Sequence, residues 1–164
     1  MKSNGRWLYW AVLMAIALGC ASDDAPRVGT SHDPLYAFPA QATFAWSERD
    51  NRVPDDPRIV RLDLGPTIER VAAEEFAAHG YQHTDSNPDY LMSYQVKIDW
   101  FKVQTSEMLG SVTLQLADGK SRHRVWSGFG RSVVHPALTT EVREQRLRKA
   151  IRQMLENFPP GAKR

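Results

Sequence analysis

The stretch DYLMSYQVKIDWFKV, residues 89–103, decides the fold class because apolar and polar side chains alternate along it. The apolar members of this alternation are Tyr90, Met92, Tyr94, Val96, Ile98 and Trp100. Successive side chains of a β-strand point to opposite faces, so the pattern predicts a long strand with one buried face. Strands with one polar face are typical of antiparallel sheets that are covered on one side only.

Two further strands are expected after this one. GSVTLQL at 110–116 continues the alternation, and the Asp-Gly pair at 118–119 is a hairpin turn signal. HRVWSGFGRSVV at 123–134 then reads as the return strand. Its glycines, Gly128 and Gly130, predict either a bulge or the close approach of another part of the backbone.

The flanking segments predict one more strand and two helices. TFAW at 43–46 is rich in strand-forming residues. The Gly-Pro pair at 65–66 suits the N-cap and first position of a helix, and Gly80 suits its end. IVRLDL at 59–64 fits either an earlier helical turn or a short strand. A second amphipathic helix is expected over about residues 140–157, where apolar residues recur at helical spacing.

The order of these elements, β-α-β-β-β-α, predicts an α+β domain. We expect an antiparallel sheet of about four strands with two amphipathic helices packed on one face.

Composition excludes several classes of protein. Lys2 and Arg6 account for the whole net charge of +2, so the rest of the 164-residue chain is formally neutral. A neutral domain gives no reason to expect nucleic acid as a partner. The single cysteine, Cys20, excludes an intrachain disulfide and a cysteine-based zinc cluster.

The N-terminus is typical of an exported protein. WLYWAVLMAIALG at 7–19 is uncharged and follows two basic residues. It is shorter than the roughly 20 apolar residues that a membrane-spanning helix needs, so it fits a signal peptide. Ala17, Leu18 and Gly19 before Cys20 resemble the lipobox of bacterial lipoproteins, although the commonest lipobox has leucine at the position of Ala17.

That resemblance implies cleavage between Gly19 and Cys20, with lipid on the Cys20 thiol and a further acyl chain such as palmitate on its amine. Two or more acyl chains make a stable anchor. By the same resemblance, Ala21 in place of aspartate favours the outer membrane, with the domain facing the periplasm. The alternative is an ordinary secretory signal followed by an incidental cysteine.

These features divide the chain into four parts. Residues 1–19 are the expected signal peptide, and residues 20–31 the lipidated cysteine with a flexible tether. Residues 32–160 form a single α+β domain, and residues 161–164 are a C-terminal tail.

The chain resembles a family of uncharacterised bacterial lipoproteins, domain of unknown function 4136. The matching stretches, in the order that the family has them, are TFAW (43–46), HGY (79–81), NPDYLMSYQV (87–96), VTLQLAD (112–118), VWSGFG (125–130) and LRKAIRQMLENFPP (147–160). The resemblance implies a lipidated α+β domain that faces the cell envelope. It implies no activity, so no catalytic residue is carried over.

The candidate metal ligands do not converge. Glu75, His79 and His83 have the spacing of ligands on one helical face, but Gly80 is expected to end the helix between them. We therefore expect no metal and no cofactor.

Catalytic motifs are also incomplete. WSGFG at 126–130 has Val125 where a nucleophile elbow needs glycine, and DGKS at 118–121 lacks the first glycine of a P-loop. Adjacent Glu74 and Glu75 would point about 100° apart on a helix and read as a solvated face. The sequence thus predicts a protein that is not an enzyme.

Two surfaces are candidates for binding. Basic residues crowd the last helix and are either a solvated face or a contact for lipid phosphates or an acidic partner. They are Arg143, Arg146, Arg148, Lys149 and Arg152. Trp46, Trp100 and Trp126 lie in expected strands and are either core residues or the lining of a groove.

The leading functional interpretation is a non-enzymatic binding or assembly module. Its expected partners are the membrane, through lipidated Cys20, and an envelope protein or lipid. An alternative is a carrier of a lipid or small amphiphile, which needs a cleft of roughly 300 Å³ between sheet and helices. A third is a cell-wall or glycan hydrolase, which needs two carboxylates roughly 5–9 Å apart across a cleft.

Overall fold

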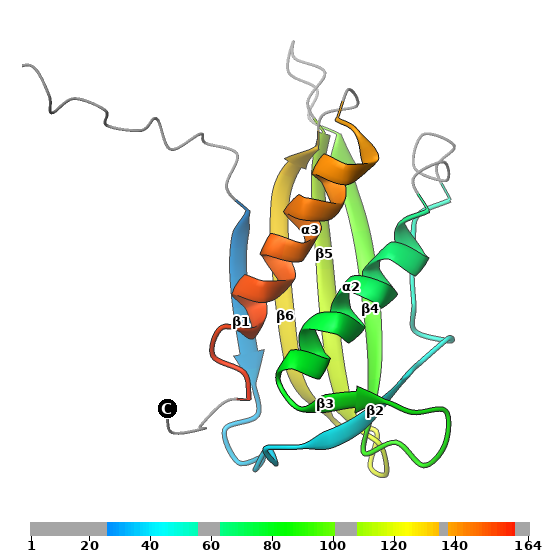
Figure 1. Ribbon diagram of the computed structural model, residues 1–164, viewed down its shortest axis with the longest axis vertical. Coiled ribbons are helices and arrows are strands. Elements are labelled where there is room, and N and C mark those ends of the chain that lie inside the picture. The colour runs from blue at the N-terminus through cyan, green and yellow to red at the C-terminus, as the bar shows by residue number, and fades with distance from the viewer. Residues whose placement is uncertain (1–25, 56–62, 101–107, 135–137, 160–164) are drawn as a thin grey trace, which may run out of the picture.

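Within the described residues, six strands form one sheet and two helices pack on one of its faces, an arrangement that can be followed in Figure 1. The computed structural model describes residues 26–55, 63–100, 108–134 and 138–159. The expected signal peptide, Gly19, Cys20 and the 161–164 tail lie outside the described residues.

The elements follow one another in this order: β1 (Arg27–His32), β2 (Ala42–Trp46), α2 (Leu64–Ala78), β3 (Tyr81–His83), β4 (Tyr90–Trp100), β5 (Met108–Asp118), β6 (Arg124–Val134) and α3 (Thr140–Leu155). The strand order across the sheet is β1-β6-β5-β4-β2-β3.

The centre of the sheet is the antiparallel meander that the alternating stretch predicts. Met92 of β4 lies opposite Leu116 of β5, and Tyr94 opposite Leu114. All four side chains are buried on the face that the helices cover. The prediction that both helices pack on one face of an α+β domain is therefore confirmed.

The number and direction of the strands were predicted wrongly. The sheet has six strands and is mixed, because β2 lies between β3 and β4 and runs parallel to both. β3 is three residues long, too short to show any periodicity. Parallel pairing of β2 with β4 also depends on contacts between distant segments, which local patterns do not reveal.

Residues 27–31, expected in the flexible tether, belong to the sheet. They lie in β1, which pairs antiparallel with β6 along the sheet edge. Most β1 side chains are exposed and only Val28 packs against the core. The strand is held by its backbone hydrogen bonds, which leave no mark in the side-chain pattern.

The helix ends are close to those expected. Asp63 is the N-cap of α2 and Leu64 its first residue, two positions before the expected start. Gly80 adopts φ +85° just past the helix, in the left-handed region that favours glycine. Thr139 caps α3 by accepting a hydrogen bond from the backbone N–H of Val142. α3 ends at Leu155, two residues before the expected end.

The two glycines of β6 mark a close approach rather than a bulge. A Cβ at Gly128 would lie 2.5 Å from Trp126 Cη2 and 3.0 Å from Met154 Sδ. A Cβ at Gly130 would lie 2.7 Å from Met154 Cε. α3 therefore packs onto β6 where the strand has no side chains. The register shift lies elsewhere, beside Leu116 of β5.

Aromatic side chains fill the core below the helices. Phe158, which follows α3, contacts the rings of Phe76, Tyr81 and Trp126 at centroid distances of 5.2, 4.9 and 5.3 Å. This cluster joins the end of the chain to α2, β3 and β6.

Candidate functional site

Most of the basic residues of α3 are engaged by partners within the domain. Arg152 Nε lies 2.9 Å from both carboxylate oxygens of Glu75, and Arg148 Nη1 lies 3.3 Å from Glu75 Oε1. Glu75 belongs to α2, and its side chain is only 10% exposed. These ion pairs therefore hold α3 against α2.

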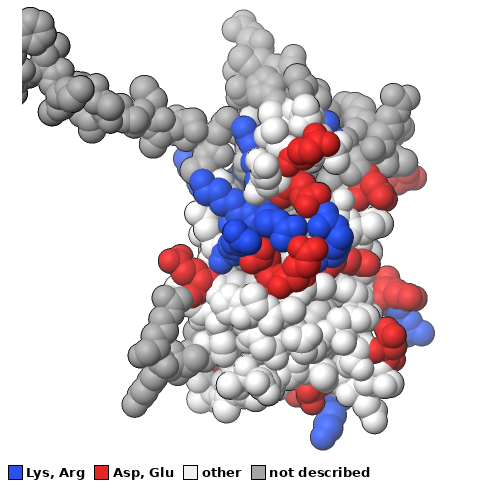
Figure 2. All heavy atoms as spheres, viewed as in Figure 1, with Lys and Arg blue, Asp and Glu red and all other residues white. Residues whose placement is uncertain are grey.

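Other acidic residues complete this network. Arg148 Nη1 lies 2.6 Å from Glu74 Oε2, and Arg70 Nη2 lies 2.7 Å from Glu144 Oε2. Hydrogen bonds from Arg148 lower the pKa of Glu74, and hydrogen bonds from Arg70 lower the pKa of Glu144. Figure 2 shows the resulting surface, where basic and acidic side chains gather side by side across the helical face.

Two further arginines of α3 bind backbone carbonyls. Arg143 donates from Nε to the carbonyl of Leu138 at 2.9 Å, and Arg146 donates from Nη1 to Val133 at 3.2 Å. Lys149 is exposed and forms no ion pair with a described residue. The five basic residues thus do not form one free cationic patch.

The three candidate metal ligands are directed apart. Glu75 binds the arginines of α3, whereas His79 Nδ1 lies 2.9 Å from the carbonyl oxygen of Phe158. His83 Nε2 lies 3.9 Å from Asp85 Oδ1 on the far side of Gly80. Within the described ranges, no three His, Cys, Asp or Glu side chains are grouped as metal ligands would be.

The side chains of two tryptophans are described: Trp126 lies in the core, and Trp46 is half-buried against it. Trp126 is 3% exposed, and Trp46 packs against Phe44 and Tyr94 with ring centroids 5.9 and 5.8 Å away. The side chain of Trp100 lies outside the described residues. The groove interpretation therefore does not apply to Trp46 or Trp126.

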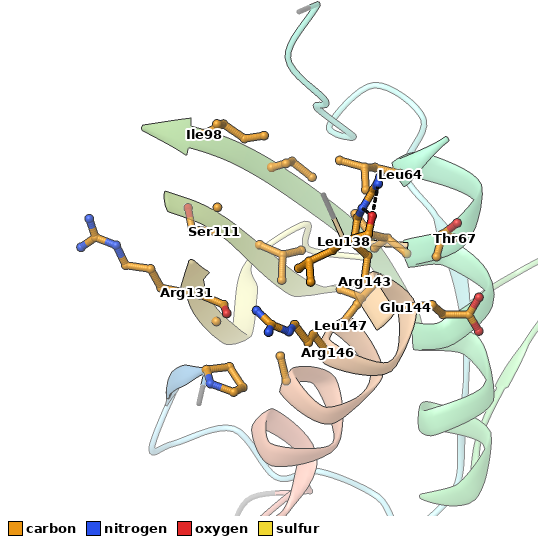
Figure 3. Close-up of a pocket in the computed structure, with 18 of the residues that line it drawn as sticks. Leu64, Thr67, Ile98, Ser111, Arg131, Leu138, Arg143, Glu144, Arg146 and Leu147 are labelled. Atoms are coloured by element: carbon orange, nitrogen blue, oxygen red, sulfur yellow. Dashed lines mark hydrogen bonds between the residues drawn. The ribbon is translucent and has the colours of Figure 1, made fainter. Parts of the chain in front are cut away.

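An apolar pocket lies between the helices and the sheet, where a carrier would need one (Figure 3). Its walls include Pro26, Leu64, Ile68, Val96 and Leu147. The volume is about 140 Å³. That is close to the size of a cavity that holds one benzene molecule and about half of the smallest typical ligand pocket.

A second, polar depression of about 280 Å³ lies beside the end of β1. It runs along residues 31–34 and 123–126. His123 Nε2 lies 3.2 Å from Asp33 Oδ2 there, and the His123 side chain is 65% exposed. This pair joins the segment after β1 to the start of β6.

Asp118 accepts several hydrogen bonds at the β5–β6 turn. Its Oδ1 accepts from the backbone N–H groups of Lys120 and Ser121 and from the Ser121 hydroxyl. Its Oδ2 accepts from the Tyr36 hydroxyl at 3.0 Å. These bonds, those of Ser121 most of all, lower the pKa of Asp118 to about 2 because they stabilise the charged carboxylate.

The sheet face opposite the helices, which no described helix covers, carries a surface that the sequence did not predict. Arg27 of β1 lies opposite Arg131 of β6 in the strand register. On the other side of Arg131, its partner is Ser111 of β5, and the partner of Ser111 is Lys97 of β4. We call Arg27, Arg131 and Lys97 the basic row. The only signal for it is strand register, because the three residues are far apart in the sequence and Arg27 was assigned to the tether.

Comparison with known proteins gives one family. A family model described as Domain of unknown function (DUF4136) matches residues 28–160. A search of curated proteins gave no match. Among the described residues, no helix has the length and apolar character needed to cross a membrane.

Two solved structures share the fold at low identity, and a third is similar to a lower degree. The PelC dodecamer from Paraburkholderia phytofirmans is 20% identical, with 79% of this chain and 96% of that chain covered and a TM-score of 0.54. A PDZ domain protein from Parabacteroides distasonis is 14% identical, with 85% and 37% covered and a TM-score of 0.57. Lipoprotein GNA1162 from Neisseria meningitidis is 15% identical, with 71% and 99% covered and a TM-score of 0.46.

Proposed function

This chain belongs to the DUF4136 family, a domain of unknown function, and we propose that it is a lipid-anchored module of the bacterial cell envelope. The module works by binding or assembly rather than by catalysis. Cys20 carries the proposal, because the only cysteine of the chain directly follows a 13-residue uncharged run. Ala21 after it favours the outer membrane and a domain in the periplasm.

The position of β1 supports an anchored role. β1 begins at Arg27, seven positions after Cys20. Seven residues span about 25 Å at full extension. A lipid on Cys20 would therefore hold the domain close to the headgroups.

The contacts of the polar residues support a role without catalysis. Glu75, Arg148 and Arg152 join the two helices, and His79 binds the carbonyl of Phe158. Each of these side chains has a structural partner.

Assembly is one form that this role can take. The PelC protein that shares the fold is a dodecamer, so the fold is compatible with association of many copies. We therefore include a second copy of this chain among the partners to be tested.

The anchor is tested by growing cells that express the chain with an alkyne analogue of palmitate. We expect label on the wild-type protein and on Ser22→Ala, the matched control, and no label on Cys20→Ala. Label that persists on Cys20→Ala would overturn the lipid anchor.

The partner is tested by crosslinking the lipidated protein in cells and identifying what copurifies by mass spectrometry. A reproducible protein partner, or a crosslinked second copy, is the expected result. Recovery of a recurrent bound lipid with no protein partner would contradict the binding module and support the carrier function.

A lipid or amphiphile carrier is the second candidate, and the apolar pocket is the observation that favours it. Its volume of about 140 Å³ is too small for a whole acyl chain. We therefore rank the carrier below the binding module.

A further inference from the structure

The basic row brings together three positive side chains on the uncovered sheet face. Arg27 and Arg131 are direct cross-strand partners, and Lys97 lies two strands further along the same line. Neighbouring strands are about 4.8 Å apart, so the two arginines begin about 5 Å from each other. Like charges directly opposite each other in a sheet are destabilising.

Nothing in the described part of the fold offsets this repulsion. None of the three side chains forms an ion pair with a described residue, in contrast to Arg148 and Arg152 on the helical face. Asp99 is the one carboxylate that the described residues of β1, β4, β5 and β6 place on this face, and it makes no ion pair with Lys97. The charges of the basic row are thus available to an anionic partner.

An exposed aromatic ring lies beside the row. Phe129 is two residues before Arg131 on the same face of β6 and is 41% exposed. Its cross-strand partner in β1 is Gly29, which has no side chain to cover it. In Figure 3, the Arg131 side chain likewise extends away from the apolar pocket. Basic side chains beside an exposed aromatic ring are typical of surfaces that meet the headgroup region of a membrane.

The row lies at the end of the sheet where the chain enters. Arg27 is the first residue of β1, whereas Lys97 and Arg131 lie near the last residues of β4 and β6. Figure 1 shows these three strand ends together, at the end of the sheet that β1 enters. An anchor at Cys20 would hold Arg27, the first residue of the row, within about 25 Å of the lipid headgroups.

We propose that the basic row and Phe129 dock the domain onto an anionic phospholipid surface, so that the sheet, rather than the basic helix, faces the membrane. This inference rests on the proposed lipid anchor for its orientation. Each basic residue near an anionic surface strengthens binding by about fivefold.

The test places a fluorophore at the proposed contact. The lipidated Gly29→Cys protein is labelled on its new thiol, a position with no other atom within 4 Å of the Cβ. It is reconstituted in vesicles of phosphatidylcholine, with or without phosphatidylglycerol, that contain a spin-labelled quencher lipid. We expect quenching in the anionic vesicles, and its loss in neutral vesicles and at high salt.

Two sets of variants identify the residues responsible. Neutralising the row with Arg27→Gln, Arg131→Gln and Lys97→Gln is expected to abolish the quenching. The matched control removes the same charge at the opposite end of the strands, with Lys120→Gln, Arg122→Gln and Arg124→Gln, and is expected to retain it. Arg27→Lys with Arg131→Lys keeps the charge and is also expected to retain it.

Three results would overturn the proposal. They are equal quenching in neutral and anionic vesicles, quenching that survives neutralisation of the row, and equal loss in the matched control. Circular dichroism of each variant shows whether the fold is intact.

Mass spectrometry separates failure of this inference from failure of the anchor. An acyl mass on Cys20 without quenching leaves the anchor standing and rejects the docking surface. Without an acyl mass the anchor is rejected, and cosedimentation of the full chain with the same vesicles then tests the row. Neutralising all three charges is expected to weaken that binding on the order of 100-fold, and an unchanged affinity would reject the row.

Discussion

At the scale of single residues, Asp118 makes the stability of the domain depend on pH in the acidic range. Its carboxylate accepts the hydrogen bonds of the β5–β6 turn, and its folded-state pKa of about 2 is below the ordinary aspartate value of 3.8. A depressed carboxyl pKa adds stability that is fully present above the unfolded-state pKa. That stability is lost as the pH falls from about 4 towards 2.

We therefore expect Asp118→Asn to flatten the pH dependence of the unfolding free energy between about pH 4 and pH 2. Urea denaturation across this range measures it. Asp85→Asn is the control, because the Asp85 side chain is 98% exposed, and its profile should follow the wild type. An Asp118→Asn profile as steep as that of the wild type would contradict the prediction.

Gly128 is needed because the structure leaves no room for a side chain at this position. A Cβ there would be 2.5 Å from Trp126 and 3.0 Å from Met154, so Gly128→Ala must displace α3 or the indole. Overpacking of this kind costs about 1–3 kcal/mol of unfolding free energy.

Thermal or urea unfolding measures that loss. Gly29→Ala is the matched control, because nothing lies within 4 Å of its Cβ position, and it should change stability by less than about 0.5 kcal/mol. Similar effects at the two glycines would show that α3 does not pack closely on β6.

At the scale of elements, the contact between α2 and α3 depends on ion pairs to a buried carboxylate, that of Glu75. Glu75→Gln leaves Arg148 and Arg152 with an uncharged partner at a buried position. We expect a loss of about 1–3 kcal/mol in the free energy of unfolding. Glu74→Gln removes an exposed carboxylate from the same network and should cost less than about 1 kcal/mol.

A double-mutant cycle between Glu75→Gln and Arg152→Gln measures the coupling of the two helices directly. We expect the double mutant to lose less unfolding free energy than the sum of the losses in the two single mutants. Equal costs for Glu74→Gln and Glu75→Gln would argue that burial of Glu75 contributes nothing.

Periodicity predicted where the helices and strands lie better than it predicted which residues contact one another in the fold. The alternation in residues 89–103 and 110–116 located β4 and β5, and helical spacing located α2 and α3. The basic cluster of α3 was read as a surface, because the sequence does not show which residues α2 places beside it. Glu74 and Glu75 were both read as solvated, but only Glu74 is exposed, since α3 covers Glu75.

At the scale of the whole molecule, the features that were missed all depend on pairing between distant segments. β1 has no fully buried side chain, and β3 has three residues, so neither shows a pattern of its own. The mixed direction of the sheet follows from β2 lying between β3 and β4.

The basic row is another consequence of the whole fold. Arg27, Lys97 and Arg131 become neighbours only through the register of four strands. Sequence analysis found the charges of α3 instead, because those are concentrated in one short segment. A charged surface assembled from a sheet is therefore harder to predict than one on a helix.

The pairing of β1 with β6 also determines when β1 can join the sheet during synthesis of the chain. Arg27 and its partner Arg131 are 104 positions apart, so β1 has no sheet neighbour until nearly all of the domain has been synthesised. Throughout synthesis up to that point, β1 has no strand to pair with. Among the described strands, β1 is thus the first to be made but cannot join the sheet before β6, the last of them, is present.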